Sequence, residues 1–174
     1  QANGTGCSQG AHIHLRKSIP AEAGMGGGSS DAATCLLALN QLWNLQLSQQ
    51  QLAEIGVQLG ADVPFFVHGH NAWVEGIGEQ ITPITLPKAQ FIVVKPEEGA
   101  PTGAIFSSPM LNRSTKPATI LSFANNANVF DFGHNDLQPV ASSICPSIQA
   151  VIEWLSTQGL KPRMTGSGST VFAL

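Results

Sequence analysis

The sequence predicts a globular protein of mixed α and β structure, and two observations carry this prediction. The stretch that begins at Ser30 places apolar side chains along one face of a helix, at Ala32, Leu36, Leu39 and Trp43. Residues 90–96, by contrast, form the continuous apolar run QFIVVKP, which is typical of a buried strand. Of the 174 residues, 43% are apolar and 11% are charged, so the chain can bury the core of one large domain or two small ones.

Charge and cysteine content narrow the class of partner. A formal net charge of −3 and a pI near 5.9 argue against nucleic acid, and no apolar run reaches the ~20 residues of a membrane-spanning helix. Cys7, Cys35 and Cys145 lie far apart and form no C-x-x-C pair, which argues against a disulfide framework and a thiolate zinc site. We therefore expect small-molecule partners and a reducing, cytoplasmic location.

The first third of the chain predicts a strand, a glycine-rich turn and two helices. Residues 11–19 (AHIHLRKSI) alternate apolar and polar side chains, the pattern of a half-buried strand that Pro20 would end. A glycine run then leads into the helix near Ser30. A second helix is predicted to follow Ser48, because Ser48 and Gln51 have capping-box spacing, and Gly60 is placed to end it.

The remainder predicts short strands, a long loop and two more helices. Residues 72–86 hold β-prone stretches broken by glycine and proline, and a domain boundary is expected between about residues 74 and 87. Residues 95–117 are rich in proline and are expected to form a loop with one short helix. Helices are predicted over 135–142 and 146–158, followed by a strand over 170–173. The tryptophans, Trp43, Trp73 and Trp154, are expected in the core.

The most informative segment is the run PAEAGMGGGSSDAA at residues 20–33. The first turn of a helix has unpaired N–H groups and the positive end of the helix dipole, and glycines ahead of it let a polyanion approach the backbone. Ser29 or Ser30 can cap the helix and present a hydroxyl to a phosphate oxygen or its magnesium. The run matches neither a Walker A loop nor the G-x-G-x-x-G fingerprint. A hinge or tight turn without a ligand is the alternative.

The histidines raise a second possibility, a metal site. His12 and His14 are two residues apart, as are His68 and His70. No Asp, Glu or Cys stands near either pair at ligand spacing, so polar alternation along a strand explains them better. The sequence assigns no metal ligands.

The glycine run closely resembles the phosphate-binding loop of the GHMP kinases, the superfamily of galactokinase, homoserine kinase, mevalonate kinase and phosphomevalonate kinase. Further motifs follow in the order seen in the branch that acts on 4-diphosphocytidyl-2-C-methyl-D-erythritol in the non-mevalonate (methylerythritol phosphate) route to isoprenoids. These motifs are LGADVPFFVHGHNAWVEGIGE (59–79), PTGAIF (101–106), NDL (135–137) and TGSGSTVFA (165–173). The resemblance covers essentially the whole chain, and Gly-Ala-Asp-Val-Pro is the part that separates this branch from its cousins.

This resemblance implies an α+β fold of two domains. We expect a partial ATP-binding domain of the ribosomal protein S5 domain 2-like type over residues 1–75, and a partial, ferredoxin-like substrate-binding domain over 76–174. Family members carry an N-terminal segment whose lysine pairs with the catalytic aspartate, and they continue for a strand and a helix beyond the position of Leu174. The chain is therefore expected to be the middle of such an enzyme, from bacterial cytoplasm or, in a plant, the plastid stroma.

The resemblance also implies the catalytic residue, Asp62. There it accepts the proton of the substrate's 2-hydroxyl as the γ-phosphoryl group of ATP transfers in line. Phosphoryl transfer has a loose transition state, so positioning and charge neutralisation by the helix dipole, Mg²⁺ and a lysine are expected to outweigh proton abstraction. From the residues alone, an Asp shortly after Gly60 is a cap or turn residue, which remains the alternative.

The other implied site residues form two groups. The ATP-binding group is the glycine loop with the lysine before it: Lys17, Pro20, Ala21, Glu22, Ala23, Gly24, Met25, Gly26, Gly27, Gly28, Ser29 and Ser30. The substrate-binding group is Thr102, Phe106, Gly166, Ser167 and Gly168. Phe106 is expected to stack on the pyrimidine ring. The alternatives are a solvated Lys17, a Phe106 buried in a minor core, and a plain hairpin turn at 166–168.

Three functional hypotheses follow. The first is a kinase that uses ATP and Mg²⁺ to phosphorylate 4-diphosphocytidyl-2-C-methyl-D-erythritol, with mevalonate-, homoserine- or galactokinase-like enzymes as its neighbours. The second is a nucleotide-binding fragment without turnover, and the third is a folded fragment without a ligand. No nucleic acid and no membrane is expected as a partner, and the oligomeric state is left open.

Overall fold

The computed structural model describes residues 9–174, which divide into two compact units. The first unit holds the described residues up to Ser18 together with 26–85, and the second holds 19–25 together with 86–174. The division between residues 85 and 86 lies inside the boundary region expected at about 74–87, but ten residues beyond the domain limits expected at 75 and 76. A hairpin over residues 72–83 keeps the first unit continuous past that point, and the short segment 19–25 packs with the second unit.

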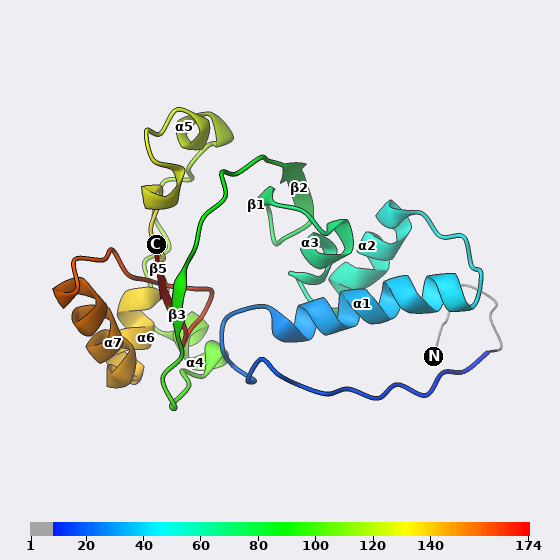
Figure 1. Ribbon diagram of the computed structural model, residues 1–174, viewed down its shortest axis with the longest axis horizontal. Helices are drawn as coiled ribbons and strands as arrows, with labels where there is room; N and C mark the ends of the chain where they lie inside the picture. Colours follow the sequence, from blue (N-terminus) through cyan, green and yellow to red (C-terminus); the bar gives the residue numbers. More distant parts are fainter. Residues whose placement is uncertain (1–8) are drawn as a thin grey trace. The chain divides into compact units, whose positions relative to one another are not determined.

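Three helices build the first unit, α1 (Gly27–Leu42), α2 (Gln49–Leu59) and α3 (Val63–His68) (Figure 1). Their shared core consists of small and branched apolar side chains, Ala33, Leu52, Ala53, Val63 and Val67. The predicted stripe is confirmed at Ala32 and Leu36, which pack against this core. Burial of this face stabilises α1, which begins with glycines and has no acidic residue in its first turn.

The start of α2 confirms the predicted capping box. The Ser48 side chain accepts from the Gln51 amide at 3.3 Å, and the Gln51 side chain accepts from the Ser48 amide at 2.9 Å. Gly60 directly follows the helix, as expected. The next helix, α3, is six residues long, and so short a segment shows no helical period in the sequence.

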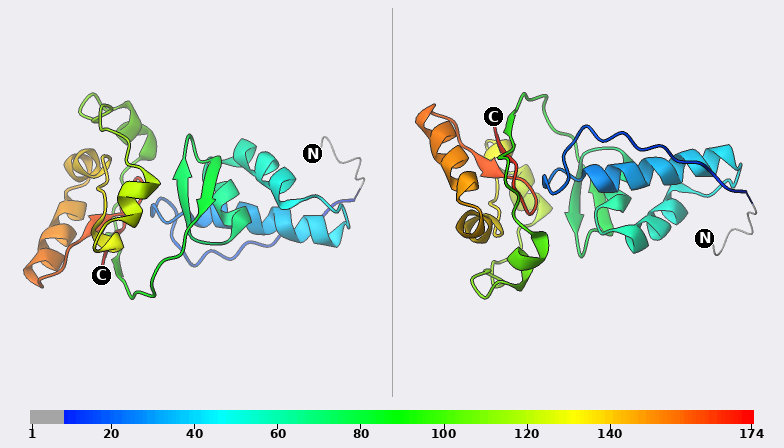
Figure 2. Two further views of the ribbon diagram at one scale, coloured as in Figure 1. Left: turned by 90° about the horizontal axis from the view of Figure 1, so that it is seen from above. Right: turned by 90° about the horizontal axis from the view of Figure 1, so that it is seen from below.

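A hairpin completes the first unit. Strands β1 (Ala72–Glu75) and β2 (Gln80–Pro83) pair antiparallel and lie side by side in Figure 2. The strand predicted over 11–19 is wrong, because these residues pair with no strand in the described part of the chain. The side chains of Ile13 and Leu15 are each 56% exposed. Alternation supplies one apolar face, but a strand also needs a hydrogen-bonded neighbour.

The second unit contains an antiparallel sheet in the order β3–β5–β4. Its strands are β3 (Ile92–Val94), β4 (Arg163–Met164) and β5 (Val171–Ala173). Its helices are α4 (Thr102–Ser107), α5 (Ile120–Ala124), α6 (Gln138–Ile144) and α7 (Pro146–Thr157), with a 3₁₀ turn at Val129–Asp131. The short helix expected within 95–117 is thus α4, and the two later predicted helices are confirmed with slightly shifted bounds. Figure 1 shows α6 and α7 next to each other beside the sheet.

Apolar side chains from α4, α6, α7 and the sheet form the core of this unit. Ile148 and Leu155 are fully buried, as the helical pattern predicts. The strand predicted within 90–96 is confirmed as β3, but its predicted burial is wrong, because β3 is an edge strand whose Ile92 and Val93 are about half exposed. Trp154 is likewise 57% exposed rather than in the core, and Trp43 and Trp73 are half-buried.

Two further findings concern the described residues alone. None of the helices within 9–174 has the length and apolar character needed to cross a membrane. Cys35 and Cys145 carry free thiols, and Cys7 lies outside the described residues.

Candidate active site

The entrance to α1 is open backbone. Gly26 is the N-cap with φ 65°, and no side chain caps the helix. The expected capping by Ser29 or Ser30 is therefore wrong, because the helix begins at Gly27 and both serines lie inside its first turn. The Ser30 amide makes the first bond of the helix, to the Gly26 carbonyl at 2.9 Å, so the amides of Gly27, Gly28 and Ser29 before it have no partner within the helix. A Cβ on Gly28 would meet nothing within 4 Å, so a ligand can reach this backbone.

Helix α3 packs against this entrance and carries Asp62 at its own start. A Cβ on Gly26 would lie 2.7 Å from the Phe66 ring, and a Cβ on Gly60 would lie 4.0 Å from the Ser29 hydroxyl oxygen. Asp62 occupies the N-cap position of α3 and is exposed, but its side chain makes no capping hydrogen bond. The alternative of a cap or turn residue is thus confirmed for its position, since Asp62 lies in the turn before α3, but no side-chain capping bond forms. The first unit thus brings an accessible carboxylate to the turn beside the start of α1.

Lys17 lies beside the same helix. Its ammonium group donates to the Asp31 carboxylate at 2.5 Å, and both side chains are a little over one third exposed. Lys17 is exposed, as the alternative of a solvated lysine expects, and it also pairs with Asp31. A role of Lys17 toward a nucleotide stays a prediction, since Asp31 already neutralises its charge in this structure.

The first half of the glycine loop belongs to the second unit. The amides of Ser169 and Thr170 each donate at 3.3 Å, to the carbonyls of Glu22 and Ala23 respectively. Ala23 is buried. These bonds tie residues 22 and 23 of the loop to the segment just before β5.

The two glycine motifs of the sequence meet at this junction. Gly24 has φ 68°, and a Cβ on it would lie 2.8 Å from the Gly168 carbonyl oxygen. A Cβ on Gly166 would lie 2.9 Å from the Gly24 carbonyl oxygen, which also accepts from the Thr165 hydroxyl at 3.1 Å. Residues 165–170 form the turn between β4 and β5, closed by the Thr165 amide donating to Thr170 at 2.9 Å. The alternative of a plain hairpin turn at 166–168 is confirmed for the backbone, because the turn joins two antiparallel strands. The same turn also contacts the glycine loop at Gly24.

Three of the predicted substrate-binding residues, Gly166, Ser167 and Gly168, belong to this turn, and a fourth, Thr102, contacts it. The hydroxyls of Thr102 and Ser167 are 2.9 Å apart. Phe106, in the last turn of α4, is 54% exposed, so the minor-core alternative is wrong. Arg113 holds the end of α4 by donating to the Phe106 carbonyl at 2.5 Å. An exposed ring held by a fixed backbone suits stacking on a planar ligand.

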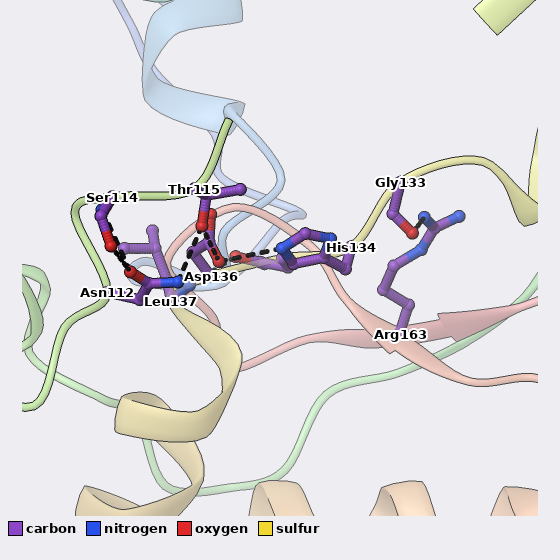
Figure 3. Close-up of polar contacts among 9 residues, drawn as sticks. Asn112, Ser114, Thr115, Gly133, His134, Asp136, Leu137 and Arg163 are labelled. Atoms are coloured by element: carbon purple, nitrogen blue, oxygen red, sulfur yellow. Dashed lines mark hydrogen bonds and ion pairs between the residues drawn. The ribbon is translucent and has the colours of Figure 1, made fainter. Parts of the chain in front are cut away.

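The Asn-Asp-Leu motif carries contacts that the sequence analysis did not foresee. Asn135 donates to the Met164 carbonyl at 2.9 Å and to the Gly166 carbonyl at 2.8 Å. Asp136 accepts from Thr115 at 3.0 Å and from His134 at 2.9 Å, as Figure 3 shows. The sequence signals only a local contact, because an Asn just before a helix accepts from nearby backbone, as Asn135 does from the Leu137 amide at 3.0 Å.

A concave pocket of about 430 Å³ lies in the second unit. Its polar lining includes Asp131, His134, Asn135, Gln138, Lys161 and Arg163. The cations there are already engaged: Lys161 donates to Asp131 at 2.7 Å, and Arg163 donates to the Phe130 and Phe132 carbonyls. None of the residues predicted to bind ATP or substrate lines this pocket.

Two carboxyl groups have perturbed acidity. The Lys161 ammonium holds the pKa of Asp131 below its ordinary value. Backbone hydrogen bonds, from its own amide and then from Ile77, hold the pKa of Glu79 below its ordinary value. Within residues 9–174, no group of three His, Cys, Asp or Glu side chains could hold a metal ion, and His68 and His70 meet edge to face.

Comparison with known proteins identifies the class. Residues 1–70 match the family described as GHMP kinases N terminal domain, and residues 120–174 match GHMP kinases C terminal. The chain belongs to the GHMP kinase family. The α+β fold of this family, expected from the glycine loop, is thereby confirmed.

The relatives narrow the branch. The chain is 61% identical, over 95% of its length, to a 4-diphosphocytidyl-2-C-methyl-D-erythritol kinase of Variovorax paradoxus, and 61% identical over 97% of its length to one of Polaromonas naphthalenivorans. It covers 60% and 58% of those two proteins, so it spans about three fifths of the curated relatives. A crystal structure of 4-(cytidine 5'-diphospho)-2C-methyl-D-erythritol kinase matches with a TM-score of 0.74 and 34% identity, over 91% of this chain and 59% of that one.

Proposed function

We propose that the whole protein is a kinase that uses ATP and Mg²⁺ to phosphorylate the 2-hydroxyl of 4-diphosphocytidyl-2-C-methyl-D-erythritol, a step of isoprenoid synthesis in the cytoplasm. The relatives that carry this name match nearly the whole chain at about three fifths identity. The observation that carries the proposal in the structure is the bare helix entrance at Gly26, with the exposed Asp62 at the neighbouring helix start.

The helix entrance supplies the phosphate-binding chemistry. Its unpaired amides and the positive end of the helix dipole favour a polyanion, and the space over Gly28 is open. Ser29 or Ser30 would present a hydroxyl to Mg²⁺, whose role is to neutralise charge on the transferring phosphoryl group. Because these groups stand ready in the fold, little reorganisation is needed when the nucleotide binds.

Asp62 supplies the acceptor for the proton of the substrate hydroxyl. Its exposure and the absence of a capping hydrogen bond leave the carboxylate available to orient that hydroxyl. Thr102 and Ser167 offer paired hydroxyls, and Phe106 offers a ring for the cytosine. Positioning by these groups is expected to contribute more than proton removal, since the transition state is loose.

The test is ADP release by the purified full-length protein with each candidate acceptor. Turnover is expected with the cytidine diphosphate substrate, and turnover with mevalonate, galactose or homoserine instead would refute the proposal. Asp62→Asn is expected to lower kcat by about 10²- to 10⁴-fold. Asp131→Asn, which changes an exposed carboxylate outside the proposed site, is the matched control and should leave kcat unchanged.

Binding measurements separate the other hypotheses. A thermal shift with ATP but no ADP release in the presence of substrate would make the protein a nucleotide binder. No thermal shift with either compound would make it a fold without these ligands. Both outcomes contradict the kinase proposal.

A further inference from the structure

The geometry points to Asn135 as a positioning residue that fixes the 165–168 turn, and through it the contacts of that turn with Gly24 and with Thr102. The residue has no role in the proposed chemistry described above. Its catalytic consequence rests on the proposed function, whereas its structural consequence does not.

Asn135 uses its whole side-chain amide. The NH₂ group donates to the Met164 and Gly166 carbonyls, at 2.9 and 2.8 Å, and the oxygen accepts from the Leu137 amide at 3.0 Å. The residue is half-buried. The Asn135 side chain therefore links the residue before α6, Leu137, to the backbone on both sides of Thr165.

The turn needs such support because its backbone conformation is unusual. Gly166 has φ 54° and Gly168 has φ 91°. Because glycine adopts positive and negative φ about equally readily, these two residues do not by themselves hold the turn in one conformation. Gln138 adds a second tie from α6, since its side-chain oxygen accepts from the Met164 amide at 2.9 Å. Together the two side chains fix the chain on the entry side of the turn.

The turn contacts two residues that are predicted to bind ligands, Gly24 and Thr102. Gly166 abuts the Gly24 carbonyl of the phosphate loop, and Ser167 places its hydroxyl 2.9 Å from that of Thr102. A shift of the Gly166 carbonyl would therefore move both contacts at once. Asn135 controls that carbonyl directly, although it touches neither Gly24 nor Thr102 through any of its side-chain hydrogen bonds.

The test compares Asn135→Asp with Asn126→Asp in the full-length protein. Asn126 also accepts from the amide two residues ahead, that of Asn128, at 3.0 Å, and an aspartate keeps that bond. At position 135 the same change replaces the donor with an oxygen that faces two carbonyls. Asn135→Ala removes the donor without this repulsion and serves as the second variant.

The first readout is the amide NMR signals of the glycines. Asn135→Asp and Asn135→Ala are expected to shift those of Gly24, Gly166 and Gly168 and to leave that of Gly159, after α7, in place. Asn126→Asp should move none of the four. Unchanged Gly166 and Gly24 signals in both Asn135 variants would overturn the inference, whatever reaction the protein catalyses.

The second readout is steady-state kinetics. A variant that only loses folded protein lowers kcat at constant KM, whereas a displaced turn should raise KM for the cytidine substrate and lower kcat/KM about tenfold or more. If the wild type shows no kinase activity, the proposed function fails while the NMR result still decides the positioning role. If the wild type is active and KM is unchanged in both Asn135 variants, the positioning role is refuted.

Discussion

Replacing Gly24 with alanine tests the junction between the two glycine motifs. Gly24 has φ 68°, and its missing Cβ would lie 2.8 and 2.9 Å from the oxygen and nitrogen of Gly168. Both are backbone atoms, so neither can rotate away as a flexible side chain would. The matched control is Gly159→Ala in the same unit, where φ is 78° and a Cβ would meet nothing within 4 Å.

The two variants share one cost and differ in another. An alanine in the left-handed region costs about 1–2 kcal/mol at either position. At Gly24 the added methyl group must also displace packed backbone, and overpacking of this kind costs typically about 1–3 kcal/mol. We therefore expect Gly24→Ala to lose about 1–3 kcal/mol more free energy of unfolding than Gly159→Ala.

Urea denaturation followed by the NMR signals of the second unit measures this difference, because the two units need not unfold in one step. ATP affinity, measured by titration, provides an independent readout: it should fall for Gly24→Ala and stay constant for Gly159→Ala. Equal unfolding free energies for the two variants, with unchanged ATP affinity in both, would show that the junction does not exist in solution.

Three further predictions concern single side chains. Ser169→Ala should leave the unfolding free energy unchanged or raised, because the buried Ser169 hydroxyl makes no hydrogen bond with the described residues; a loss above about 1 kcal/mol would reveal a hidden partner. Ile148→Ala should cost about 2–5 kcal/mol in urea denaturation, because the side chain is fully buried in the second core, and a cost below about 1 kcal/mol would contradict that packing. Lys161→Met should raise the pKa of Asp131 in an NMR titration, an effect that salt weakens because the pair is exposed. Because the pKa of Asp131 is lowered in the folded state, the ion pair stabilises the protein at pH values above the ordinary carboxyl pKa. This stabilisation is lost as the pH falls through the lowered pKa. The difference in unfolding free energy between wild type and Lys161→Met should therefore become smaller in acid.

The helices were predictable where the sequence states a local rule. The capping box at Ser48 and the stripe through Leu36 depend on residues three or four apart, and both are found. The strand at 11–19 failed because pairing is a long-range property that alternation does not specify. Burial of β3 failed for a related reason, since an apolar run does not say whether the strand lies at the centre or the edge of its sheet.

In the candidate site, too, the features that depend on local sequence were predictable and the long-range contacts were not. The glycine loop was recognisable because glycine is needed where another group packs closely against the backbone, as the Phe66 ring does at Gly26. The expected serine caps were wrong, because the helix starts before them and uses a glycine instead. The contacts of Asn135 were out of reach, since Met164 and Gly166 lie about thirty residues further along the chain.

Because residues 19–25 belong to the second unit, they also affect the order in which the chain folds during its synthesis. The bond between Thr165 and Gly24 joins positions 141 residues apart, so that part of the chain leaves the ribosome long before its partner exists. Closing so large a loop is slow and entropically costly, and the first unit has its own core with which to fold meanwhile. The glycine loop is therefore expected to reach its final structure late in folding. A second unit produced without residues 1–85 would lack the carbonyls that its Ser169 and Thr170 amides need.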